Sequence, residues 1–154
     1  MRALELKIPP ALLCLLLMLL SYGYGSWQQA RLLPELSWLA VIGIAALVLG
    51  AGCCVAGVLS FRRARTTVNP LAPERATQLV IRGIYHLSRN PMYLGFALML
   101  LGTGLLWQQL SAVVWTFLLM AYLQRFQIVP EERALTQLFG EQYLAYCAKV
   151  RRWL

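Results

Sequence analysis

Side chains that can bind a charged ligand lie together at the border of an apolar stretch in the second half of the chain. Between Gly83 and Gly95 the sequence holds one histidine, one arginine, one asparagine and two tyrosines, and a long apolar run follows directly. Ionisable side chains are costly in hydrocarbon, so a chain that keeps them at a membrane border generally uses them there. Arg89 and Asn90 both donate hydrogen bonds, which suits the binding of a carboxylate.

Two adjacent carboxylates, Glu131 and Glu132, follow the last apolar stretch. A carboxylate at the end of a membrane span is partly desolvated and needs a cationic partner. The preceding Pro130 is typical of the first turn of a helix, where acidic side chains also offset the helix dipole. On its own, the segment is equally well explained as an amphipathic helix at the membrane interface. Its apolar stripe consists of Leu135, Leu138, Phe139, Tyr143 and Tyr146.

The composition predicts an integral membrane protein. Of 154 residues, 60% are hydrophobic and 13% are charged, and the mean hydropathy of +0.62 is too high for a soluble domain of this size. We therefore expect one all-α polytopic membrane domain with about four transmembrane helices. The apolar stretches are residues 10–24, 36–61, 93–107 and 110–129. We divide the chain into two N-terminal spans (1–61), a loop (62–92), a helical hairpin (93–129) and a C-terminal segment (130–154).

The lysines and arginines predict the orientation of these spans. Six lie between the second and third stretches, five at or after the end of the fourth, and two before the first. Only Arg31 belongs to the opposite side. The positive-inside rule therefore predicts that both termini and the central loop are cytoplasmic. The net charge of +8 indicates this topology and contact with anionic membrane lipids, and it does not indicate binding of nucleic acid.

The first apolar stretch has an alternative interpretation as a secretory signal peptide, because Arg2 and Lys7 precede it. It ends without a clear small-x-small cleavage pattern, and it is longer than most signal-peptide cores. We expect it to be retained as a membrane span.

The cysteines do not predict a metal site or a disulfide framework. Cys14, Cys53 and Cys54 lie in apolar stretches, Cys147 lies near the C-terminus, and no CxxC pair occurs. We expect inert thiols and no bound metal. The single histidine, His86, lies in a basic loop, where a solvated side chain is the more common outcome.

Two separated motifs resemble those of the isoprenylcysteine carboxyl methyltransferase and phospholipid methyltransferase family. The first is Gly83-x-Tyr85-x-x-x-Arg89-Asn90-Pro91-x-Tyr93-x-Gly95, and the second is Glu131-Glu132-x-x-Leu135-x-x-x-Phe139-Gly140-x-x-Tyr143-x-x-Tyr146. They occur in the family's order with a hairpin between them, and the resemblance covers roughly residues 70–154. The family commonly has histidine at the position of Asn90. Asparagine cannot titrate, which excludes a proton shuttle there.

The resemblance implies that the central loop and the C-terminal segment together bind S-adenosylmethionine. The sequence has no strand and glycine-rich turn that would form a Rossmann-type site instead. Arg89 and Asn90 would hold the carboxylate of the cofactor, and Glu131 or Glu132 would hold its ammonium or ribose hydroxyls. The implied catalytic residues are Arg89, Glu131 and Glu132. The implied cofactor-binding residues are these three with Gly83, Tyr85, Asn90, Pro91, Tyr93, Gly95 and Tyr143.

Several of these residues also have purely structural explanations. Arg89 could serve the membrane topology alone, and Tyr85 and Tyr93 could belong to the aromatic belt at the interface. Small residues in the third stretch could open a groove for a lipid tail, but close helix packing is their more common use. These are Gly95, Gly102 and Gly104.

The sequence leaves the methyl acceptor and the oligomeric state open. A carboxylate acceptor needs only a positive group to hold it, whereas an amine acceptor needs a base, and the chain offers both arginines and glutamates. We expect a lipophilic or prenylated acceptor that enters from the bilayer. The alternatives are an NADPH-dependent enzyme resembling membrane sterol reductases and a non-enzymatic membrane scaffold. The glutamate pair and the tyrosine spacing favour the methyltransferase.

Overall fold

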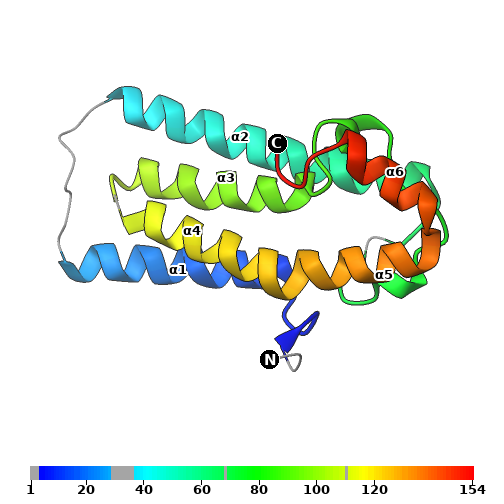
Figure 1. Cartoon of the computed structure of the whole chain (residues 1–154). Helices are drawn as coiled ribbons and strands as arrows, with labels where there is room; N and C mark the ends of the chain where they lie inside the picture. Colours follow the sequence, from blue (N-terminus) through cyan, green and yellow to red (C-terminus); the bar gives the residue numbers. More distant parts are fainter. Residues whose placement is uncertain (1–3, 29–36, 68, 110) are drawn as a thin grey trace.

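The computed structural model describes residues 4–28, 37–67, 69–109 and 111–154, and all regular structure in these ranges is helical. Four apolar helices form a bundle, and two further helices extend from one end of it (Figure 1). The bundle consists of α1 (Pro10–Gln28), α2 (Ser37–Arg63), α3 (Pro91–Leu106) and α4 (Ser111–Leu123). The extension consists of α5 (Val129–Phe139) and α6 (Glu141–Lys149). The prediction of an all-α membrane helix bundle is therefore confirmed.

The helices differ in their ability to cross a bilayer. Among the described residues, three helical stretches are long and apolar enough: Pro10–Trp27, Trp38–Arg63 and Ser111–Phe139. The fourth apolar helix, α3, has 16 residues, fewer than the roughly 20 that span a bilayer unaided. The expected starts of the second and fourth spans, Leu36 and Leu110, lie outside the described residues, as do Arg2 and Arg31 of the charge pattern.

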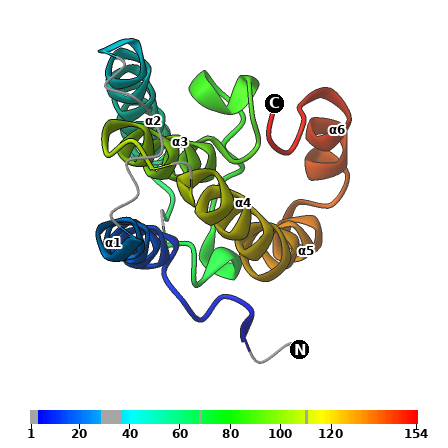
Figure 2. The same cartoon turned by 90° about the vertical axis from the view of Figure 1, so that its left-hand side faces the viewer.

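The core lies where α1, α3 and α4 meet. Viewed from its end, the bundle has α3 beside α2, and α4 beside both α3 and α1 (Figure 2). The side chains of Leu100, Leu119 and Leu123 have no exposed surface and pack with Leu13 and Tyr93. These contacts hold α3 against α4, the helix that leads into α5. The polar segment that precedes α3 is thereby placed on the same side as α5.

Pro130 lies in the first turn of α5, but α5 is a continuation of the preceding helix and not a new one. A π-helical turn, Gln124–Ile128, joins α4 to α5, and its last bond runs from the N–H of Val129 to the carbonyl of Gln124. Proline has no N–H for the carbonyl four residues earlier, so Phe126 needs another donor. The backbone N–H of Leu6 supplies it at 3.0 Å. The fourth apolar stretch and the start of the C-terminal segment are therefore one continuous helical rod.

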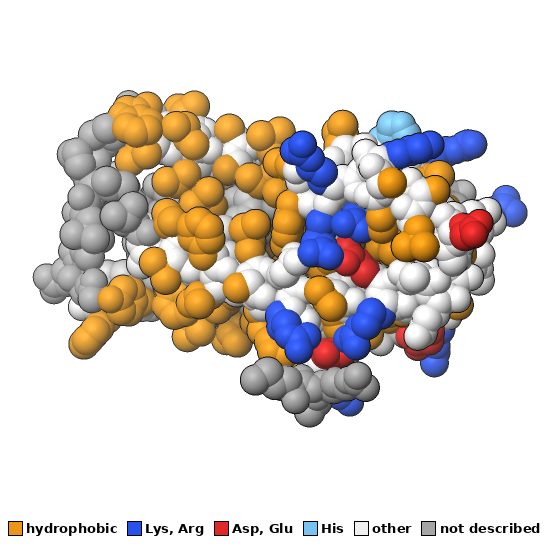
Figure 3. Space-filling model, in the orientation of Figure 1, with side chains coloured by type: hydrophobic (Ala, Val, Ile, Leu, Met, Phe, Trp, Pro, Cys, Tyr) orange, Lys and Arg blue, Asp and Glu red, His pale blue; other side chains and the backbone are white. Residues whose placement is uncertain are grey.

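The charged side chains gather at the end of the molecule that holds α5 and α6, whereas the opposite part of the visible surface is hydrophobic (Figure 3). At that end, Glu5 pairs with Arg125 at 3.5 Å and with Arg133, which attaches the N-terminal segment to the rod. The separation of polar and apolar surface fits the predicted topology. That this end faces the cytoplasm stays a prediction.

Glycines let α2 and α3 approach closely. A Cβ atom on Gly95 would lie 2.6 Å from the carbonyl oxygen of Gly50, and one on Gly102 would lie 2.7 Å from that of Gly43. A Cβ on Gly104 would meet Ala112 of α4. Close helix packing is thus the structural use of the three glycines of α3.

This packing predicts opposite outcomes for two substitutions two residues apart on α2. Gly50→Ala forces a Cβ against the Gly95 carbonyl at 2.6 Å and should lower the free energy of unfolding by about 1–3 kcal/mol. Gly52→Ala meets nothing within 4 Å and should leave stability unchanged or raise it by up to about 1 kcal/mol. Thermal unfolding in detergent micelles measures both. Equal melting temperatures would contradict the packing described here.

Candidate functional site

A cavity of about 340 Å³ lies at the polar end of the bundle. Small-molecule sites in proteins typically measure roughly 300–1,000 Å³, so this cavity is large enough for a compact ligand. Its wall comes from the start of α1, the loop after α2, the turn before α3, and helices α3, α5 and α6. The segments that the sequence assigned to one site therefore meet around one cavity.

Most of the residues predicted for the site line this cavity. They are Tyr85, Arg89, Asn90, Tyr93, Glu131, Glu132 and Tyr143. Gly83, Pro91 and Gly95 do not line it. Gly83, with φ of +67°, begins the short turn Gly83–His86 that carries Tyr85, Pro91 begins α3, and Gly95 packs against α2.

His86 lies outside the cavity lining. Its ring is exposed, and its Nδ1 lies 3.2 Å from the carbonyl oxygen of Ile81. This agrees with the expectation of a solvated histidine.

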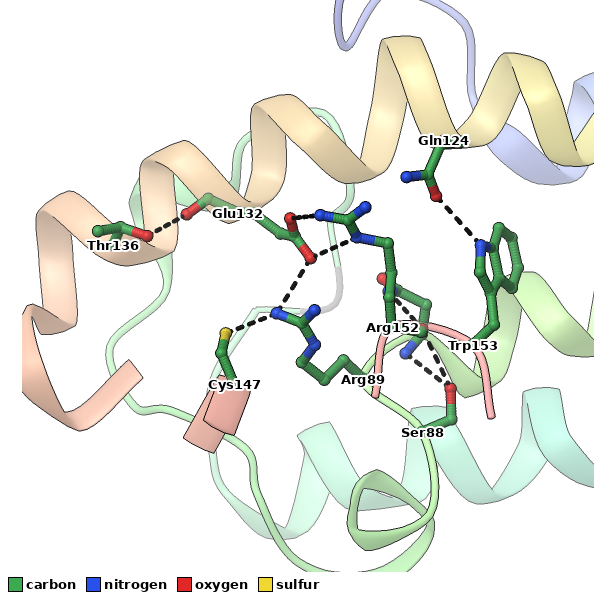
Figure 4. A network of polar contacts seen from close by, with 9 residues as sticks. Ser88, Arg89, Gln124, Glu132, Thr136, Cys147, Arg152 and Trp153 are labelled. Atoms are coloured by element: carbon green, nitrogen blue, oxygen red, sulfur yellow. Dashed lines mark hydrogen bonds and ion pairs between the residues drawn. The ribbon is translucent and has the colours of Figure 1, made fainter. Parts of the chain in front are cut away.

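Glu132 lies at the centre of an ion-pair cluster (Figure 4). Its Oε1 is 3.2 Å from Nη1 of Arg89 and 2.9 Å from Nε of Arg152, and its Oε2 is 2.6 Å from Nη2 of Arg152. The Glu132 side chain is 17% exposed and that of Arg89 is 14% exposed. The cluster carries one net positive charge and joins the turn before α3, helix α5 and the C-terminal residues.

Arg89 keeps an unused donor inside this cluster. Its Nη1 contacts the thiol of Cys147 as well as Glu132. Its Nε is buried and has no hydrogen-bond partner among the described residues. A buried guanidinium donor without a partner is destabilising. The Nε–H of Arg89 is therefore available to donate to a ligand oxygen while Nη1 keeps its pair with Glu132.

The C-terminal residues are tied to the turn before α3. The N–H of Arg89 donates to the carbonyl of Arg151 at 3.0 Å, and Nδ2 of Asn90 donates to the carbonyl of Arg152 at 2.9 Å. The hydroxyl of Tyr146 donates to the carbonyl of Tyr85 at 2.6 Å. Asn90 occupies the N-cap position of α3 but makes no side-chain capping bond, because its amide holds the tail instead.

Glu131 is in a different electrostatic situation from its neighbour. Its Oε1 accepts hydrogen bonds from the hydroxyl of Tyr93 and, at 2.7 Å, from Nε2 of Gln127. No described cation pairs with it, and its Oε2 makes no hydrogen bond with any described residue. The expectation of a cationic partner therefore holds within the described chain for Glu132 and not for Glu131. Glu131 is a cavity carboxylate with one oxygen available to a ligand.

The tyrosines of the cavity wall act as neutral groups. Burial raises the pKa of Tyr143 and Tyr146 far above the usual tyrosine value. Burial also raises the pKa of Tyr85, and the negative charge of Glu131 raises it further. At physiological pH these residues present aromatic faces and uncharged hydroxyls, which suits ligand binding better than proton transfer.

Three contributors to the site escaped the sequence analysis. Arg152 was only one of the five basic residues counted at or after the end of the fourth stretch, Cys147 was expected to be an inert thiol, and Gln127 lay within the expected span 110–129. Only Gln127 had a usable signal, because it precedes Glu131 by four residues and so shares its face of a helix.

Comparison with known proteins decides the family. The model of the phospholipid methyltransferase family matches residues 38–142. The chain belongs to this family. The matched region includes both glutamates and the whole Gly83–Gly95 segment, and the chain is accordingly a membrane methyltransferase.

Individual relatives agree with this assignment. The chain is 32% identical over 130 residues to a probable protein-S-isoprenylcysteine O-methyltransferase of Oryza sativa subsp. indica. The aligned region covers 82% of this chain and 68% of the relative. It is 31% identical over 142 residues to protein-S-isoprenylcysteine O-methyltransferase A of Arabidopsis thaliana. That alignment covers 90% of this chain and 70% of the relative. No solved structure matches the chain significantly.

The ion-pair cluster predicts unequal roles for two neighbouring arginines. Arg152→Met removes two bonds to the half-buried Glu132 and should lower the free energy of unfolding by about 1–2 kcal/mol, a value reduced because Arg152 is partly exposed. Arg151→Met keeps the backbone carbonyl that Arg89 uses and should have no effect. Thermal unfolding of both variants in micelles tests this. A loss of stability in Arg151→Met as large as in Arg152→Met would count against the cluster.

Proposed function

We propose that the chain transfers a methyl group from S-adenosylmethionine, bound in the cavity at the polar end, to a lipophilic acceptor in the membrane. The observation that carries the proposal is a pair of unused polar groups in one cavity wall, one acceptor and one donor. Among the described residues, Glu131 is a carboxylate without a cation, and Arg89 has a buried donor without an acceptor. A ligand with both an ammonium and a carboxylate would satisfy the two together.

The residues of the cavity fit the cofactor that the family implies. When bound, S-adenosylmethionine supplies a methyl group on a positively charged sulfur. Nε of Arg89 would hold the carboxylate, because charge-assisted bonds from guanidinium to carboxylate are strong. Oε2 of Glu131 would take the ammonium or the ribose hydroxyls. Aromatic faces of Tyr85, Tyr93 and Tyr143 suit the adenine ring and the sulfonium charge.

Orientation and exclusion of water would provide most of the catalysis. Methyl transfer is a direct displacement, so aligning the acceptor with the methyl group in a desolvated cavity lowers the barrier without a covalent enzyme intermediate. The ion-pair cluster of Glu132, Arg89 and Arg152 fixes the cationic side of the cavity. Its single net positive charge also attracts an anionic acceptor.

A prenylcysteine-like carboxylate is the acceptor that we favour. The relatives named above are isoprenylcysteine O-methyltransferases, and a carboxylate needs only a positive group to hold it at the site. The cavity wall also contains apolar residues at the membrane border, Pro10 and Ala11 of α1 and Phe96 of α3, which suit a lipid chain that arrives from the bilayer. A lipid amine is the second possibility, because the family is named for phospholipid substrates. We further infer that this end of the protein is cytoplasmic, which a reporter fused to the C-terminus reads out.

Cofactor binding gives the first test. Calorimetric titration of the purified full-length protein with S-adenosylhomocysteine should show binding. Glu131→Gln and Arg89→Met should each weaken it by about 2 kcal/mol or more, roughly 30-fold in Kd, because each substitution leaves a buried ligand group unpaired. Arg75→Ala, an exposed position outside the cavity lining, serves as the control and should bind like the wild type. Wild-type affinity in both cavity variants would remove these residues from the site.

The acceptor gives the second test. Methyl transfer from labelled S-adenosylmethionine should occur with a farnesylated cysteine derivative that has a free carboxylate, and it should be absent with the corresponding amide. Phosphatidylethanolamine in the same micelles tests the amine alternative. Labelling of phosphatidylethanolamine but not of the prenylcysteine would overturn the carboxylate assignment and leave the cofactor site intact.

A further inference from the structure

Gln127 is a fully buried polar residue in the π-helical turn between α4 and α5, with 1% of its surface exposed. Its Nε2 donates to the carbonyl oxygen of Pro70 at 2.6 Å and to Oε1 of Glu131 at 2.7 Å. A main-chain carbonyl and a carboxylate oxygen can only accept hydrogen bonds. The amide nitrogen must therefore face both partners, so the orientation of the Gln127 side chain is fixed by its surroundings.

This arrangement determines which oxygen of Glu131 remains available. Gln127 and Tyr93 both donate to Oε1, which occupies that oxygen and leaves Oε2 without a partner among the described residues. A glutamate side chain on a helix is otherwise free to rotate. Without the two donors, the carboxylate of Glu131 could turn toward the arginines that pair with the adjacent Glu132.

The second bond of Gln127 reaches a neighbouring part of the cavity wall. Pro70 belongs to the loop after α2, and Thr67, Asn69, Pro70 and Pro73 of this loop line the cavity. Within the loop, the N–H of Thr77 donates to Oγ1 of Thr66 at 2.9 Å. One amide group thus sets the distance between the glutamate and this wall.

Gln127 lies in the π-helical turn that joins α4 to α5. Such turns insert one extra residue, shift the helix face that follows, and often occur at functional sites. Here Gln127 and Glu131 are four residues apart and point to the same side of the rod, as their hydrogen bond demonstrates.

We propose that Gln127 is a positioning residue of the methyl-transfer site, whose amide holds Glu131 with Oε2 toward the bound cofactor and holds the adjacent wall loop through Pro70. This inference rests on the proposed function. Gln127 does not line the cavity itself, so its effect on ligand binding passes through Glu131 and Pro70.

A double-mutant cycle in the full-length protein tests this role. Gln127→Met keeps the side-chain length and removes both donations. It should raise the Kd for S-adenosylhomocysteine about ten-fold in the wild-type background, the scale of one lost hydrogen bond to a charged group. In the Glu131→Gln background the same substitution should raise the Kd by a clearly smaller factor, because the part of its effect that passes through Glu131 is already lost and only the part that passes through Pro70 remains. Gln137→Met, at an exposed position of α5, is the matched control and should bind like the wild type.

The outcomes separate the two proposals. If the wild type does not bind S-adenosylhomocysteine, the proposed function fails and this inference fails with it. If the wild type binds and Gln127→Met binds equally well, or weakens binding to the same extent in both backgrounds, the proposed function stands and the positioning role is wrong. Should Gln127→Met not fold, as judged by thermal unfolding, Gln127→Asn replaces it. Its amide is too short to reach both acceptors, and the same two-background comparison applies.

Discussion

The site depends on the ion pairs that Glu132 makes with Arg89 and Arg152. These three residues come from parts of the chain that are remote in sequence, and each of those parts is short. In the low dielectric near a membrane border, two cations around one carboxylate attract more strongly than they would in water. The contact brings the turn before α3 and the C-terminal tail to α5, and the cavity lies beside this cluster, with the turn and α5 in its wall.

The ion-pair cluster also determines which partners the adjacent Glu131 has. Because Glu132 takes both arginines, Glu131 is left with the neutral donors Tyr93 and Gln127. Two consecutive glutamates thus divide into one that maintains the structure and one that faces the ligand space. Close glycine-mediated packing of α2 against α3 fixes the position of α3. This matters for the site because α3 carries Tyr93 and begins directly after Asn90.

Much of this could be predicted from the sequence because it follows from local signals. Hydropathy identified the apolar helices, and the two polar motifs at the ends of the hairpin had to meet once the hairpin was recognised. The remainder depends on tertiary contacts. Nothing local distinguishes Arg152 from Arg151, and the partner that the Phe126 carbonyl finds in Leu6 is more than a hundred residues away. Gly95, which the motif assigned to the ligand, packs on Gly50, because a glycine in a motif does not by itself distinguish close approach to a ligand from close packing of two helices.

The central claim is that Arg89 and Glu131 hold the two charged ends of one cofactor. A structure of the full-length protein with bound S-adenosylhomocysteine tests it most directly. The account predicts the ligand in the cavity between α5, α6 and the turn before α3, with its carboxylate within hydrogen-bond distance of Nε of Arg89 and its ammonium or ribose hydroxyls within reach of Oε2 of Glu131. A ligand bound elsewhere, or bound in this cavity without contact to either residue, would contradict it.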